Sequence, residues 1–126
     1  MAVVIDTSVL IDHLRGNEAA RAVLRGAATA GQRLYASVLT KVEVLAGVRP
    51  SEEYATRRLL DSLDWVDVDN QLAEVAGMLA RQYLPSHPGV DPVDYIIAAT
   101  TQRLGAELWT RNVRHFPMFP GLRAPH

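Results

Sequence analysis

The chain has 126 residues, 48% apolar and 21% charged, and its 13 basic and 14 acidic residues leave a formal net charge of −1. These values are typical of one globular domain, so we expect a single domain over residues 1–126 and exclude both a disordered chain and one coated in positive charge. The absence of cysteine and of glycine-rich phosphate loops excludes disulfide scaffolds, thiol nucleophiles and Walker-type nucleotide sites.

No apolar stretch of the chain is long enough to cross a bilayer. The longest apolar run near the start, residues 2–5, ends at Asp6, and no basic segment precedes it. We therefore expect no signal peptide, no membrane association and a cytoplasmic location.

The first half of the chain alternates short apolar runs with helical patterns. The expected elements are, in chain order, a strand at 2–5, a helix from Asp6 to Gly16, a helix capped by Asn17, a strand at 33–37, a helix from about Thr40 to Ala46 and a helix capped by Ser51.

The second half repeats this alternation. The expected elements are a strand at 65–68, a helix from Asn70 through Tyr83, a helix opened by Asp91 and Pro92 and ended by Gly105, and a strand at 108–110. Short strands separated by helices predict a mainly parallel sheet with helices on both faces. In such a sheet, functional sites form beyond the carboxyl ends of the strands.

Acidic residues stand near three of the expected helix starts. Asp6 directly follows the first strand, where we favour a functional site over a helix cap. Glu43 lies three residues after Thr40, and Asp94 lies three after Asp91, which is the spacing of a capping box. Each of these pairs alone favours capping. Together, however, carboxylates that converge on one edge of a sheet repel unless a cation neutralises them, and oxygen ligands suit Mg²⁺ or Mn²⁺.

The segment after the last strand carries further polar side chains. Arg111 and Arg114 are candidates to hold phosphates, and Asn112 or His115 is a candidate to reach a metal ion or its water. The alternative is an ordinary polar loop, which these residues taken alone favour. We expect four other residues to be solvated at the surface: Asp12, His13, His87 and His126.

Four strings occur in a fixed order along the chain: IDTSVLIDHLRG (Ile5–Gly16), TKVEVLAG (Thr40–Gly47), DYIIAAT (Asp94–Thr100) and WTRNVRHF (Trp109–Phe116). Together they resemble the PIN-domain ribonucleases, specifically the VapC toxins of bacterial toxin–antitoxin pairs, over nearly the whole chain. The resemblance implies a PIN-like three-layer α/β/α sandwich, an RNA substrate, a VapB-type antitoxin as partner, and a homodimer.

The resemblance also implies a site and a chemistry. Asp6, Glu43 and Asp94 match the family's acidic metal site, which implies an Mg²⁺-dependent endoribonuclease with Mn²⁺ as a substitute ion. The family often supplies a fourth acid at the position of Asn112 or His115, and neither is acidic here. The second metal position therefore stays open, with Asp91, or Asn112 acting through a water, as a candidate to compensate.

Two alternatives remain at this point. The missing fourth acid permits a metal-poor PIN-like domain that serves mainly as a protein- or RNA-binding module. A PIN nuclease for RNA maturation is equally compatible with the residues. We also expect the apolar residues of helices 20–24 and 55–63 to be partly exposed and to be covered by an antitoxin or a second subunit.

Overall fold

A four-stranded, entirely parallel sheet forms the centre of the computed structural model, which describes residues 1–126. The strands lie in the order β3–β2–β1–β4: Asp64–Val66 (β3), Arg33–Ser37 (β2), Ala2–Ile5 (β1) and Glu107–Trp109 (β4). The chain moves outward from β1 to β3 and then returns to the other side of β1. This reversal creates a topological switch point between β1 and β4, which is where parallel sheets place their sites.

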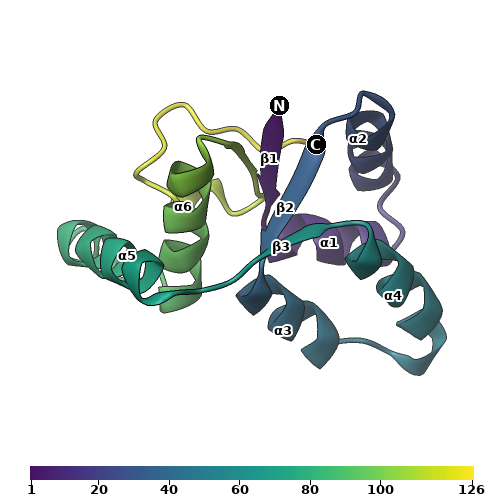
Figure 1. Cartoon of the computed structure of the whole chain (residues 1–126), viewed down its shortest axis with the longest axis horizontal. Coiled ribbons are helices and arrows are strands. Elements are labelled where there is room, and N and C mark those ends of the chain that lie inside the picture. The colour runs from purple at the N-terminus through teal and green to yellow at the C-terminus, as the bar shows by residue number, and fades with distance from the viewer.

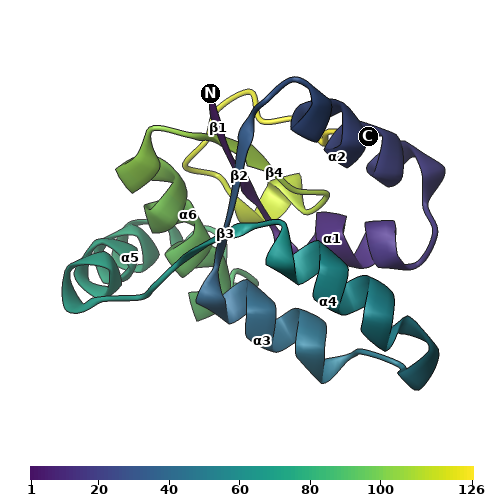
Figure 2. The same cartoon turned by 45° about the vertical axis from the view of Figure 1, so that its right-hand side comes forward.

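Helices cover both faces of this sheet (Figure 1). They are α1 (Thr7–Leu14), α2 (Glu18–Thr29), α3 (Val38–Ala46), α4 (Glu53–Asp61), α5 (Asn70–Tyr83) and α6 (Pro92–Leu104), with single 3-10 turns at Pro50–Glu52 and Val113–His115. Figure 2 shows α1 to α4 on one side of the strands and α5 with α6 on the other. The predicted three-layer α/β/α sandwich with a parallel sheet is therefore confirmed. None of the helices combines the length and the apolar character needed to span a membrane.

The central strand β1 is covered on both faces. Val3 and Ile5 pack into the cluster beneath α1 to α4, whereas Val4 packs against Ile97 of α6 on the opposite face. All three β1 residues are fully buried, because successive side chains of a strand point to opposite faces and each face carries a helical layer. Asp6, the next residue, is thus delivered to the edge of the sheet by a rigid strand.

Two helices begin earlier than the sequence predicts. α3 starts at Val38, and its cap is Ser37, whose Oγ accepts the backbone N–H of Leu39 at 3.2 Å. The expected start at Thr40 is wrong because β2 ends at Ser37 and the chain turns into helix at once. The cap of α5 is likewise Asp69 and not Asn70.

Other boundaries differ by a few residues. Ser51 does not cap α4; it lies inside a 3-10 turn in which the carboxylate of Glu52 accepts the backbone N–H of Arg49 at 3.0 Å. The third strand ends at Val66, two residues before the predicted end, and β4 begins and ends one residue early. The last helix, by contrast, has the predicted proline start and ends at Gly105 in the left-handed conformation, with φ of 57°.

Candidate active site

Asp6 lies at the switch point and is buried, with 4% of its surface exposed. Its backbone N–H donates to the carbonyl of Trp109, which ties it to β4. Its Oδ2 accepts hydrogen bonds from the hydroxyls of Thr110 at 2.7 Å and Ser8 at 2.9 Å. Although Asp6 occupies the capping position of α1, its side chain makes no capping hydrogen bond. The side chain of Asp6 therefore does not act as a helix cap, and its role in a functional site stays a prediction.

Glu43 does not form the capping box that its spacing from Thr40 suggested. Because α3 begins at Val38, Glu43 lies in the middle of the helix and its side chain is exposed. Its Oε1 accepts the hydroxyl of Thr7 at 2.6 Å, and that hydroxyl also lies 3.2 Å from Oγ1 of Thr40. The carboxylate is thus held beside the residue that follows Asp6.

Asp94 does form a capping box with Asp91, as the sequence predicts. The backbone N–H of Asp94 donates to Oδ1 of Asp91 at 3.2 Å, and the return bond to Oδ2 of Asp94 measures 3.4 Å. Asp94 is nevertheless only 8% exposed, and its Oδ2 lies 3.2 Å from Nδ1 of His115. Capping therefore fixes the orientation of a buried carboxylate that faces the loop after β4.

The charges at this edge of the sheet repel each other. Burial, together with the negative charges of Asp91 and Asp6, raises the pKa of Asp94 to about 6 from the usual 3.8. The backbone N–H of Asp91 and the His115 ring oppose this rise, and the charge of Asp6 is the smallest of these influences. Asp6 and Asp94 therefore lie within range of each other's charge, although they come from opposite ends of the sequence.

The donor set at this edge fits a hydrated divalent cation. As they stand, no three acidic or histidine side chains reach one common metal position. Mg²⁺ commonly keeps several waters and is held by only one or two carboxylates. Asp6 and Asp94 are buried oxygen donors whose mutual repulsion a cation would relieve, and the exposed Glu43 is placed to act through water. Asp91 is exposed and engaged in the capping box.

The loop after β4 is joined to Asp6 through its backbone. The N–H of Arg111 donates to Oγ of Ser8 at 3.0 Å, and the N–H of Asn112 donates to Oγ1 of Thr110 at 2.9 Å. The side chain of Asn112 is exposed and makes no hydrogen bond, so its role toward a metal stays a prediction. Arg114 is exposed at the same rim and, like Arg111, stays a predicted phosphate contact.

Sequence reasoning missed the hydroxyl groups that support the carboxylates. Thr110 is fully buried and supplies the shortest hydrogen bond to Asp6, whereas Thr7 holds Glu43. Thr110 directly follows β4, so the rule that sites lie at strand ends could have identified it. The partner of Thr7 is 36 positions away, and no local pattern reveals it.

Two of the residues expected at the surface are in fact engaged with each other. The side chains of Asp12 and His126 are only 16% and 5% exposed, and Nε2 of His126 lies 3.0 Å from Oδ2 of Asp12. Arg111 donates to both oxygens of the same carboxylate. The expectation of solvated surface residues is wrong here because the end of the chain folds back onto α1.

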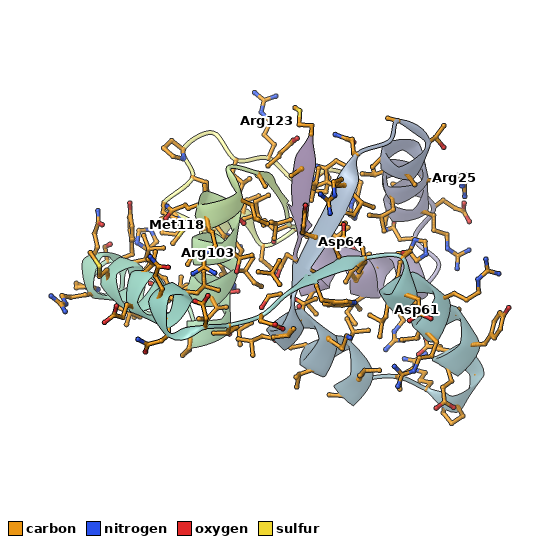
Figure 3. The ribbon with its side chains drawn as sticks, in the orientation of Figure 1. Arg25, Asp61, Asp64, Arg103, Met118 and Arg123 are labelled. Atoms are coloured by element: carbon orange, nitrogen blue, oxygen red, sulfur yellow. The ribbon has the colours of Figure 1, made fainter.

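The largest cleft lies away from the acidic residues, between α2 and α4, and has a volume of about 750 Å³. Its walls include Ala55, which is exposed, and Leu24 and Leu63, each 6% exposed. The expected partial exposure of the apolar residues on these helices is confirmed for Val23, Ala55 and Leu59. It is wrong for Ala20, Leu24 and Leu63, which are buried. Four arginines also line the cleft: Arg21, Arg25, Arg33 and Arg58. Figure 3 shows Arg25 on α2, across from the α4 side of the cleft.

A parallel α/β/α sandwich with acidic residues near its switch point places its candidate site at the carboxyl ends of the strands. The PIN domain family matches residues 3–118, so the chain belongs to that family. It is 47% identical over 122 residues to "Ribonuclease VapC19" of Mycobacterium tuberculosis, covering 97% of this chain and 98% of that protein. It is 40% identical over 123 residues to "Ribonuclease VapC10" of the same species, covering 98% and 92%.

Solved structures share the fold over the same length. A toxin–antitoxin complex from Klebsiella pneumoniae contains a chain with a TM-score of 0.80 and 28% identity, covering 98% of both chains. DNA-bound VapBC from Salmonella typhimurium gives a TM-score of 0.79 at 22% identity, covering 98% of this chain and 96% of that one. The second likeness concerns the fold alone.

Proposed function

We propose that this protein is a metal-dependent endoribonuclease that acts as the toxin of a VapBC-type pair. One observation carries the chemistry: two buried carboxylates, Asp6 and Asp94, come from separate elements to one edge of the sheet and repel each other. Such an arrangement suits a divalent cation, and the whole-chain relatives named as ribonucleases supply the substrate class.

Each residue of the candidate site has a separate proposed role. Asp6 and Asp94 are the principal ligands of Mg²⁺ or Mn²⁺, and Glu43 orients a water or completes the ligand set. When bound, the ion binds a phosphate oxygen and lowers the pKa of an attacking water. Thr110, Ser8 and Thr7 hold the carboxylates in place through the hydrogen bonds described above.

Cleavage of a labelled total-tRNA pool tests this proposal. The parent protein is compared with Asp6→Asn and Asp94→Asn in Mg²⁺, Mn²⁺ or EDTA. We expect cutting by the parent that needs metal, and no cutting by either variant at equal folding, judged by circular dichroism. A folded parent that cuts neither tRNA nor ribosomal RNA, and whose calorimetric titration with Mn²⁺ shows no site dependent on Asp6, would instead favour the binding-module alternative.

We also propose that a VapB-type antitoxin covers the cleft between α2 and α4. The likeness to a toxin–antitoxin complex at 28% identity supports the kind of partner, and the four arginines of the cleft favour an acidic segment of that partner. Growth arrest on induction, relieved by co-expressing a small neighbouring gene, would separate a toxin from an RNA-maturation nuclease. Arg25→Glu should keep the arrest and weaken the relief, whereas Asp61→Asn should change neither.

Self-association is a separate proposal. Val42 on α3 and Met78 on α5 are large apolar side chains that are 64% and 66% exposed. We expect a homodimer that covers them. Light scattering after size-exclusion chromatography checks this, and a monomer at micromolar concentration would contradict it.

A further inference from the structure

Three charged or titratable side chains meet outside the acidic site, on the outer side of α1. Nη1 of Arg111 lies 2.9 Å and 2.8 Å from the two carboxylate oxygens of Asp12, and Nε2 of His126 lies 3.0 Å from one of them. Burial alone would raise the pKa of Asp12, yet hydrogen bonds from His126 and Arg111 bring it below its usual value. The carboxylate is therefore ionised and shared between two partners.

Arg111 is fixed at both of its ends. Its backbone N–H donates to Oγ of Ser8, which in turn donates to Asp6, so the main chain of Arg111 is part of the hydrogen-bond network of the site. Its guanidinium contacts Asp12 through Nη1 only, while the side chain is 54% exposed. The Nε and Nη2 groups make no hydrogen bond in the structure and stay available as donors. Asp12 thus orients the guanidinium without using up its donors.

His126 is held in this position by packing as well as by its hydrogen bond. The segment that leads to it places Met118, Phe119 and Leu122 against the apolar cluster formed by Val4, Leu108 and their neighbours. The His126 side chain is 5% exposed, and Nε2 faces the carboxylate of Asp12 from this buried position.

We propose that Asp12 and His126 are positioning residues that hold Arg111 ready to bind a phosphate of the RNA strand. This inference rests on the proposed nuclease function and extends it to three residues outside the acidic set. An arginine whose orientation is already fixed loses less conformational freedom when it binds a phosphate. The contacts of Asp12 and His126 therefore strengthen binding of the substrate and leave the rate of the chemical step unchanged.

The sign of the effect of Asp12→Asn separates this inference from its rival. A simple charge argument, in which Asp12 repels RNA or competes for Arg111, predicts that removing the negative charge tightens RNA binding. The positioning role of Asp12 predicts the opposite. In Asp12→Asn the Arg111 side chain becomes disordered, and RNA binding weakens about three- to tenfold. Asp61→Asn, an exposed change of the same charge at the end of α4 (Figure 3), serves as the matched control and should leave binding unchanged.

The experiment measures binding of fluorescently labelled total tRNA by anisotropy in EDTA, with cleavage measured separately in Mn²⁺. Arg111→Gln should weaken binding about tenfold and lower the slope of log K against log salt by about 0.7–0.9, the loss of one phosphate contact. His126→Ala should weaken binding, and His126→Gln, which keeps a donor near the position of Nε2, should restore most of it. KM for cleavage should rise in these variants with kcat unchanged.

A double variant keeps the test independent of folding. If Asp12 acts through Arg111, then Asp12→Asn adds nothing in the Arg111→Gln background. Tighter or unchanged binding by Asp12→Asn, or full additivity in the double variant, would overturn the inference. A parent that binds tRNA without cutting it refutes the nuclease proposal alone, whereas a parent that does not bind tRNA refutes the phosphate contact as well.

Discussion

Replacing Asp94 with Asn should stabilise the metal-free protein at neutral pH while removing cleavage. The pKa of Asp94 is raised to about 6 from 3.8, and a tenfold change in an equilibrium constant is about 1.4 kcal/mol, so the ionised form costs at most about 3 kcal/mol. The Asp94 side chain is 11% exposed and lies beside His115, which is 43% exposed. Screening by solvent therefore reduces the expected gain to about 1–2 kcal/mol. Asparagine keeps an oxygen that can accept the N–H of Asp91, so the capping box survives.

The pH dependence of this gain follows from the direction of the pKa change. A raised pKa in the folded state means that protonated Asp94 favours folding below about pH 4, and this contribution is lost as pH rises through about 6. The variant lacks this titration. Its advantage over the parent should therefore be near zero at pH 4 and complete by pH 7.

Thermal unfolding in EDTA measures the effect. At pH 7.5 the midpoint of Asp94→Asn should exceed that of the parent by about 3–10 °C, given about 3–5 °C per kcal/mol for a chain of this size. Added Mn²⁺ should raise the midpoint of the parent and not that of the variant. A variant less stable than the parent at pH 7.5, or an advantage that persists unchanged at pH 4, would refute the electrostatic argument.

Two further substitutions test the supports of the site and the corrected helix start. Thr110→Val removes the donor 2.7 Å from buried Asp6. It should lower the free energy of unfolding in urea by about 1–3 kcal/mol and slow cleavage. The control Thr56→Val removes a buried hydroxyl without a partner and should be neutral or stabilising. Ser37→Ala removes the cap of α3 and should lower the free energy of unfolding by about 1 kcal/mol. The control Ser51→Ala should change it by less than about 0.5 kcal/mol. Equal losses in both variants would contradict the assigned cap.

The parts of the fold that were predicted well carry strong local signals. An unbroken apolar run defines β1, and proline after Asp91 together with Gly105 marks both ends of α6. The start of α3 was not predictable in this way. Serine and threonine cap equally well, and the choice between Ser37 and Thr40 depends on where β2 stops pairing with β3, which involves residues far along the chain.

In the candidate site, too, local sequence signals predicted some positions, whereas contacts between distant residues were not predictable. The positions of Asp6 and Asp94 followed from strand and helix ends, which periodicity reveals. Their hydroxyl partners did not, because Thr110 meets Asp6 across 104 positions and Thr7 meets Glu43 across 36. The alternative in which Glu43 closes a capping box fails for a related reason, because a helix start two residues earlier places Glu43 in the middle of α3.

The separation between Asp6 and Thr110 also bears on when the enzyme can act after synthesis begins. A ribosome adding about 5–20 residues per second takes about 5–20 seconds to pass from one residue to the other. During that time the nascent chain contains Asp6 without the hydroxyl of Thr110 and without β4 beside it. The contact between Asp94 of α6 and His115 is also still missing. On the proposed function, the growing polypeptide is harmless to the message and transfer RNAs around it, and a partner translated nearby has that interval in which to accumulate.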